Sequence, residues 1–160
     1  MTFPTVSGSN LLREKLTLPQ DFQGKFNLVF IPFEQWHQVE VDSWMALASK
    51  LESQFEGLVY YELPTIQNRN SLFRMFINEG MRAGIPNPKS RERTITLYLD
   101  KADFRAALGL PDEENIYVLM VDQHGQEFFR VGGPYSPEGE AVLVLTFSRL
   151  TRSSENQVTN

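Results

Sequence analysis

The sequence predicts an α/β fold with a mostly parallel sheet and helices on both of its faces. Segments of strand character alternate with segments of helical period, in the order β-α-β-α-β-α-β-β-α, which is typical of this class. One run, "KFNLVFIPF" from Lys25 to Phe33, is apolar over the length of a strand, as expected for a strand buried on both faces. The chain has 160 residues, of which 41% are hydrophobic, enough for one substantial core.

The first half of the chain contains two such β-α units. Pro32 cannot donate to a sheet, so the first strand should end near it. Apolar residues then recur every three or four positions from Val41 to Phe55, which predicts a helix that Gly57 ends. "LVYYELP", from Leu58 to Pro64, predicts the next strand. The second helix is marked by a further apolar periodicity, at Leu72, Phe73, Phe76, Ile77 and Met81.

The second half predicts a strand, a short helix, a hairpin and a last helix. "NPKSRER" is expected to be a loop. Ser136, followed by Pro137 and acidic residues, is a strong start signal for the last helix. Its continuation, "AVLVLTFSRL", favours helix, with strand as the alternative. The other elements are the strand 94–99, the helix 101–110 capped by Asp100, the strand 115–122 and its hairpin partner 127–133.

The composition of the two ends differs from that of the middle. Positions 1–10 are small and polar, and residues 1–15 are expected to form a flexible segment. Residues 151–160 are expected to form a solvated, flexible tail. One domain is therefore expected over residues 16–150.

Several strings, in this order and spacing, resemble the peroxiredoxin-like branch of the thioredoxin-like superfamily. "LPQDFQGKFNLVFIPF" is similar to the opening strand and Phe-x-Pro ending of that branch. "TITLYLDKADFRAALGL" resembles its inserted strand and helix, and "IYVLMVDQHGQEFFRVGG" its terminal hairpin. The resemblance implies a thioredoxin-like three-layer α/β/α sandwich with a mixed sheet.

The redox residues of that branch are missing. Counted from Pro32, the position of the family threonine falls near Trp36 and that of the reactive cysteine near Val39, and the chain has no cysteine at all. The arginine before the hairpin is replaced by the acids of "PDEENIY", and Pro111 lies too early to match the cis-proline of thioredoxins. Because thiol peroxidases and disulfide reductases need a thiolate, neither activity is expected.

A second resemblance concerns partners. Ser43–Trp44 and the strand 115–122 are similar to ATP-synthase assembly proteins of the Atp10 type, which look like cysteine-poor relatives of the same fold. This resemblance implies a protein that binds or assembles other proteins. No partner is identified by it.

His37, Glu40 and Asp42 form the most site-like cluster of polar residues, at the start of the first helix. A general base or a metal ligand is one interpretation. The favoured interpretation is a solvated first turn whose acids complement the helix dipole. An enzyme or small-ligand binder that uses these three residues is the alternative function.

Two further sets of residues are candidates for binding. Phe33 and Trp36 flank the former redox position and would contact a partner if they are exposed. Lys89, Arg91 and Arg93 could hold an acidic partner or an anionic ligand, although an ordinary solvated loop is favoured.

We therefore expect a cysteine-less, redox-inactive thioredoxin-like protein that acts as a protein-binding, assembly or chaperone-type factor. No cofactor and no metal are expected. A net charge of −5 argues against nucleic acid. No apolar run reaches the roughly 20 residues that span a bilayer, and "MTFPTVSGSN" is unlike a secretory signal, so a cytoplasmic location is expected. The oligomeric state is left open.

Overall fold

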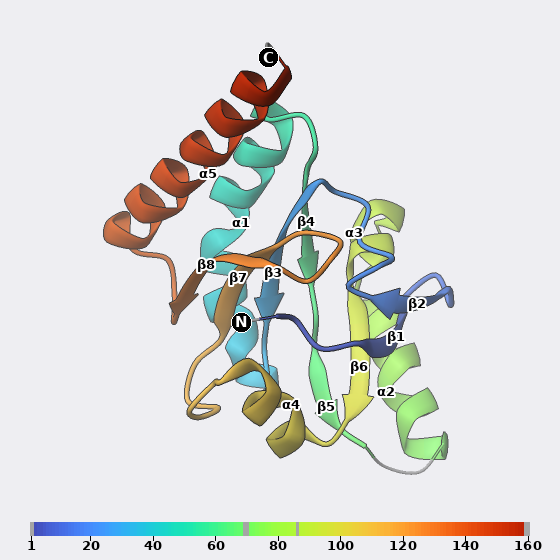
Figure 1. Cartoon of the computed structure of the whole chain (residues 1–160). Helices are drawn as coiled ribbons and strands as arrows, with labels where there is room; N and C mark the ends of the chain where they lie inside the picture. Colours follow the sequence, from blue (N-terminus) through green and yellow to red (C-terminus); the bar gives the residue numbers. More distant parts are fainter. Residues whose placement is uncertain (1, 69–70, 86, 159–160) are drawn as a thin grey trace.

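The computed structural model describes residues 2–68, 71–85 and 87–158 (Figure 1). The strands are β1 Val6–Asn10, β2 Lys15–Leu18, β3 Phe26–Ile31, β4 Leu58–Glu62, β5 Thr65–Gln67, β6 Ile95–Leu99, β7 Tyr117–Val121 and β8 Glu127–Gly132. The helices are the 3-10 helix η1 Gln35–His37, α1 Gln38–Gln54, α2 Ser71–Gly84, α3 Pro88–Arg93, α4 Lys101–Leu108 and α5 Pro137–Val158. The described residues include no helix long and apolar enough to cross a membrane.

Strand β3 is central, as its apolar sequence predicted. It pairs in parallel with β4 and antiparallel with β7, and β8 completes a sheet of order β4-β3-β7-β8. A second sheet has the order β2-β1-β6-β5. Only Leu63 and Pro64 separate β4 from β5, and a bridge between Glu62 and Thr94 connects the two sheets. The eight strands therefore form one mixed layer, which Figure 1 shows running across the molecule.

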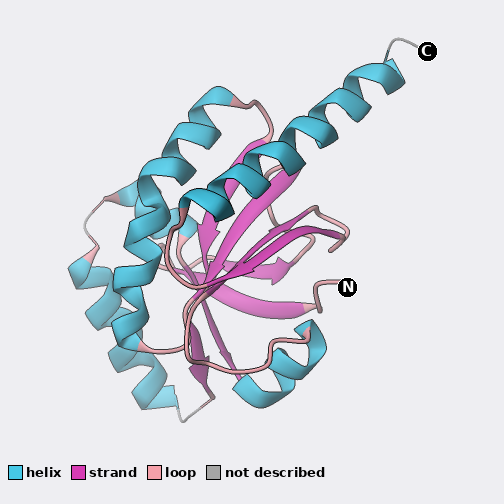
Figure 2. Cartoon of the chain, turned by 90° about the vertical axis from the view of Figure 1, so that its left-hand side faces the viewer, coloured by secondary structure: helices cyan, strands magenta, loops and turns pink. Residues whose placement is uncertain are grey.

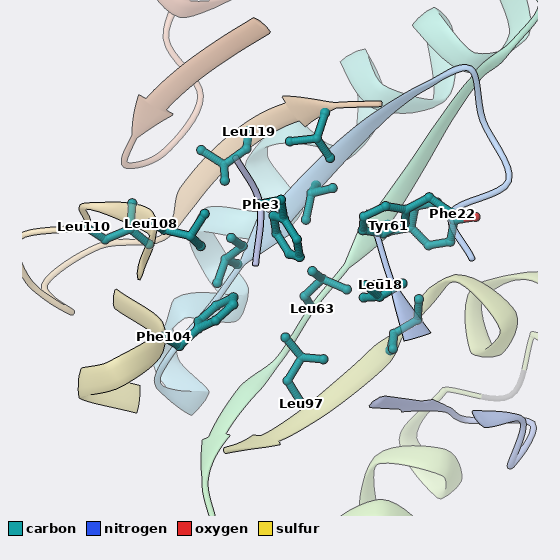
Figure 3. Close-up of a cluster of buried hydrophobic side chains, with 14 of the residues drawn as sticks. Phe3, Leu18, Phe22, Tyr61, Leu63, Leu97, Phe104, Leu108, Leu110 and Leu119 are labelled. Carbon is teal, nitrogen blue, oxygen red and sulfur yellow. The ribbon is translucent and has the colours of Figure 1, made fainter. Parts of the chain in front are cut away.

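Side chains of β3 alternate between two apolar clusters on opposite faces of this layer. Leu28 and Phe30 belong to the cluster that α1 and α5 cover, and these two helices lie along one side of the sheet in Figure 2. Val29 and Ile31 belong to the other cluster, which the N-terminal segment and α4 complete. Figure 3 shows Phe3, Phe22 and Phe104 converging there. The molecule is thus a three-layer α/β/α sandwich.

Secondary structure was not expected at the two ends of the chain or in one connection, and the structure has it in all three places. Residues 1–15 were expected to be flexible, but they contain β1 and the first residue of β2, because β1 pairs with both β2 and β6. The expected tail, 151–160, is helical as far as Val158. "NPKSRER" forms α3 instead of a loop, because Asn87 caps its first backbone N–H groups and Pro88 occupies its first position.

Apart from β2 and β5, which were not expected, the remaining elements agree with the expected order. The inserted strand and helix correspond to β6 and α4, and the hairpin to β7 and β8. The segment "AVLVLTFSRL" lies in helix α5, so the favoured of its two interpretations is confirmed. Side chains of the predicted second helix at Leu72, Phe73 and Phe76 lie outside the described residues, whereas the backbone of α2 is as predicted.

Candidate functional site

The start of α1 presents two large apolar side chains to solvent. Trp36, in η1, is 57% exposed, and Val39, in the first turn of α1, is 75% exposed. Val39 is the residue near which the sequence resemblance placed the reactive cysteine of peroxiredoxins. The surface at this position is exposed and apolar.

His37 lies between these two residues and points inward. Its side chain is fully buried, which corrects the expectation that it would be accessible. Its Nδ1 accepts hydrogen bonds from the backbone N–H groups of Phe33 (2.9 Å) and Glu34 (3.2 Å). Nδ1 is consequently unprotonated and Nε2 carries the proton. Nε2 is buried without a partner among the described residues, so the imidazole fixes the turn and has no nitrogen free to act as a base.

Glu40 is also used internally. Its carboxylate is buried, and Oε2 accepts a hydrogen bond from the backbone N–H of Ile116 over 3.0 Å. Ile116 lies directly before β7, and its carbonyl accepts from the backbone N–H of Gly133 over 2.9 Å. The bond to Glu40 therefore ties α1 to the sheet and leaves the carboxylate no access to a substrate.

Asp42 lies on another side of α1, where it interacts with Gln38 and Glu62. Sequence reasoning did not identify these two polar residues. It is exposed and accepts a hydrogen bond from Nε2 of Gln38 over 2.9 Å. Burial, followed by the negative charge of Asp42, raises the pKa of the Glu62 carboxyl to about 7, against a hydrogen bond from Gln38 and the charge of Arg93. Glu62 ends β4, and nothing in its local sequence marks it as unusual.

The expected trio of His37, Glu40 and Asp42 therefore does not converge on one cleft. Two of the three are buried in separate structural roles, and the third faces solvent. Within the residues that the structure describes, no group of His, Asp and Glu side chains could hold a metal ion. The arrangement supports no acid–base chemistry of the kind that this trio would need.

Phe33 is buried in the core, so it cannot contact a partner as the sequence suggested. Its ring packs edge-on against Tyr117. Its carbonyl accepts a hydrogen bond from Nζ of Lys101 over 2.7 Å, and the same ammonium lies 3.2 Å from Glu113 and 3.6 Å from Glu34. Lys101 thus connects α4 to the turn before η1.

The basic candidates lie far along the chain in α3, and two of them are committed to internal contacts. Arg93 makes two hydrogen bonds to Glu52, of 2.7 and 3.1 Å, and its guanidinium stacks over the ring of Tyr60. Arg91 donates to the carbonyls of Ile85 and Arg82, at the end of α2. Lys89 is mostly exposed and lies 3.8 Å from Glu52. These residues stabilise the junction of α1, α2 and α3, and they do not form a free basic patch.

Several exposed residues lie at the start of α1 and beside it. Trp36, Val39 and Ser43 lie on one side of the helix, because their spacing of three and four residues brings them round to the same direction. The hydroxyl of Ser43 accepts a hydrogen bond from the backbone N–H of Tyr135 over 2.9 Å, and Tyr135 is itself exposed. We call Trp36, Val39, Ser43 and Tyr135 the Trp36 strip.

Trp44 lies behind the Trp36 strip, in the core. Trp44, one residue further along α1, is fully buried, and its Nε1 donates to the carbonyl of Gly133 over 3.0 Å. The ring of Tyr135 packs edge-on against Trp44. Tyr135 follows β8 by only three positions, and its place beside α1 depends on the loop that leads to α5, which explains why sequence reasoning missed it.

Comparison with known proteins identifies the fold. No protein-family profile and no curated protein sequence matches the chain. Among solved structures, it is similar to the exposed lipoprotein thioredoxin Etrx1 of Streptococcus pneumoniae, with a TM-score of 0.57 and 10% identity over 91% of this chain and 99% of that one. A thiol:disulfide interchange protein of the thioredoxin family from Chlorobium tepidum gives 0.52 and 14%, over 91% and 95% of the two chains.

A third structure, the thioredoxin domain of a thiol-disulfide oxidoreductase from Bacteroides vulgatus, gives a TM-score of 0.50 and 15% identity, over 92% of this chain and 95% of that one. These similarities cover nearly all of each chain. The protein therefore has the thioredoxin-like fold that the sequence resemblance implied. Its sequence contains no cysteine, in contrast to what the thiol-disulfide chemistry named for these proteins requires.

Proposed function

We propose that this protein is a redox-inactive thioredoxin-like factor that binds another protein through the Trp36 strip. The observation that carries the proposal is the exposure of Trp36 and Val39 where a thioredoxin-like redox site would lie. Exposed tryptophan is costly to leave in water, and it is the side chain most enriched among residues that dominate protein interfaces. His37 and Glu40, beside the strip, are occupied internally, which favours binding over catalysis.

The charge around the strip indicates the character of the partner. Glu34 precedes Trp36 and Asp42 follows Val39 in the sequence, and both acidic residues are exposed. From Glu34 to Glu62 the chain carries six acidic residues and one lysine. A complementary segment presents an apolar side chain to the strip and has lysine or arginine residues beside it. An assembly or chaperone-type role is consistent with recognition of such a segment in a client protein.

The alternative function, an enzyme or small-ligand binder centred on His37, Glu40 and Asp42, has no observation in its favour. His37 offers no accessible nitrogen, and the carboxylate of Glu40 is used by Ile116. The exposed apolar surface is instead the feature that a binding module requires.

Site-specific photocrosslinking tests the proposal. A photoreactive phenylalanine derivative is incorporated at position 36 in one variant and at position 142 in the other. Val142 is a matched control, because it is 54% exposed on α5 and lies outside the strip. We expect position 36 to crosslink to a defined peptide of a partner, with apolar and basic residues at the linked site. Equal products from both positions, or none from position 36 in lysate of the source cells, would contradict the proposal.

A further inference from the structure

A second surface, distinct from the Trp36 strip, contains a pocket of about 540 Å³. It lies between the β1–β2 hairpin and α2, which stand side by side in Figure 1. The described residues that line it are Ser9, Asn10, Leu11, Arg13, Lys15, Arg74, Asn78, Glu79 and Arg82. This volume falls within the range of about 300–1,000 Å³ that small-molecule sites occupy.

The lining is strongly cationic for a chain whose net charge is −5. Arg13 and Lys15 come from the hairpin, Arg74 and Arg82 come from α2, and Glu79 is the one carboxylate in the described lining. Arg13 pairs with Glu79 over 2.9 Å. Neither Lys15 nor Arg74 forms an ion pair with any residue that the structure describes. Among the described residues, Arg82 also has no carboxylate partner, so Arg13 is paired and the other three cations of the lining are not.

The backbone conformation at Arg13 is unfavourable for an arginine. Arg13 has a φ of +67°, in the left-handed region that normally favours glycine or asparagine. The side-chain oxygen of Asn10 holds the turn, accepting from the backbone N–H groups of Leu12 and Glu14, both over 3.0 Å. Glycine would fit this turn without strain, so the arginine costs stability and needs another explanation.

Arg82 contributes the third guanidinium group of the lining. Its Nε has almost no accessible surface and no hydrogen-bond partner among the described residues, so a ligand in the pocket does not reach this atom. Guanidinium groups match the paired oxygen atoms of phosphate and carboxylate groups, and three arginines line this pocket.

We propose that the pocket between the β1–β2 hairpin and α2 binds a small organic anion that carries two or more phosphate or carboxylate groups. Lys15, Arg74 and Arg82 supply the positive charges that its charged groups contact, and Arg13 lies at the rim, where it pairs with Glu79. Glu79 lowers the affinity, because its carboxylate pairs with Arg13 and repels the negative charge of the ligand.

Isothermal titration calorimetry at low ionic strength tests the proposal, with inorganic pyrophosphate and citrate as separate probes. The two probes distinguish a phosphate site from a carboxylate site. We expect at least one of them to bind with one-to-one stoichiometry, and the double variant Lys15→Gln/Arg74→Gln to weaken binding by about tenfold or more. Glu79→Gln should strengthen binding, because it removes the one negative charge of the described lining.

Two single variants separate a specific site from general charge. Arg13→Gly removes a cation and relieves the left-handed strain, so binding should weaken while the melting temperature stays constant or rises. Arg149→Gln removes one positive charge from an exposed position on α5, which changes the net charge by the same amount as Arg13→Gly. It should leave binding unchanged. Absence of binding by both probes at millimolar concentration would overturn the proposal. Equal weakening by Arg149→Gln would overturn it as well, because the effect would then be general charge.

Discussion

The carboxylate of Glu40 accepts a hydrogen bond from the backbone N–H of Ile116 over 3.0 Å, which ties the first turn of α1 to the residue before β7. A buried carboxylate that resembled a catalytic acid in the sequence is thus a structural brace. Glu40→Ala leaves the N–H of Ile116 without an acceptor and should lower the free energy of unfolding by about 2 kcal/mol. Urea unfolding measures the change.

Glu56→Ala is the control for this experiment, because Glu56 is exposed in the turn after α1. It should change stability by no more than about 0.5 kcal/mol. A loss as small for Glu40→Ala as for Glu56→Ala would show that the bond to Ile116 does not support the fold.

The raised pKa of Glu62, about 7, predicts a specific dependence of stability on pH. The folded state holds this proton more tightly than the unfolded state, whose glutamate has a pKa near 4.5. The contribution of the group is therefore fully present below about pH 4.5 and is lost as the pH rises through 7. The loss should be on the order of 2–3 kcal/mol. Urea unfolding of wild type and Glu62→Gln between pH 4.5 and 8 should show it in the wild type only.

Asp42→Asn checks the cause of this pKa. Because the charge of Asp42 is the second cause of the shift, after burial, its removal should move the transition to lower pH. A pH dependence identical in wild type and Glu62→Gln would remove Glu62 from the explanation.

The two tryptophans should respond in opposite ways to truncation. Trp44 is fully buried, so Trp44→Ala should cost about 3–5 kcal/mol of stability. Trp36→Ala removes a side chain that is 57% exposed and should leave the melting temperature nearly unchanged. Thermal unfolding by circular dichroism compares the two. A melting temperature that falls as far for Trp36→Ala as for Trp44→Ala would mean that Trp36 belongs to the core.

The absence of cysteine predicts no peroxidase and no disulfide-reductase activity. Metal-free protein should neither consume peroxide nor reduce insulin above the rate of buffer. Val39→Cys would place a thiol at an exposed helix N-terminus, where it should react readily with an aromatic disulfide reagent. Turnover of peroxide by the cysteine-free wild type would contradict the redox-inactive part of the proposed function.

The fold could be predicted because its strongest signals are local. The apolar run at Phe26–Ile31 and the cap at Ser136 define elements by sequence alone. Strand β1 was missed because Val6–Asn10, "VSGSN", has no strand pattern of its own and gains its structure from pairing with β2 and β6. Tertiary pairing there overrides the weak local propensity.

The site was less predictable, because burial of a polar residue cannot be inferred from its position in a helix. The sequence placed His37 and Trp36 side by side at the start of a helix, but it could not show that one points inward and the other outward. The 3-10 turn before α1 decides their directions. The position of Tyr135 and the pocket between the β1–β2 hairpin and α2 depend on contacts between segments far apart in the sequence. The local sequence pattern does not indicate such contacts.

The most direct test of the proposed function is the affinity of a partner, identified by crosslinking at position 36, for two matched double variants. Trp36→Ala/Val39→Ala removes the two most exposed apolar side chains of the strip, and Val142→Ala/Leu145→Ala removes two of similar exposure, 54% and 52%, from α5. Calorimetry should show a loss of at least about 2 kcal/mol, or roughly thirtyfold in Kd, for the first variant. The second should bind as wild type does. Equal affinity of both variants and the wild type would contradict the claim that the Trp36 strip is a protein-binding surface.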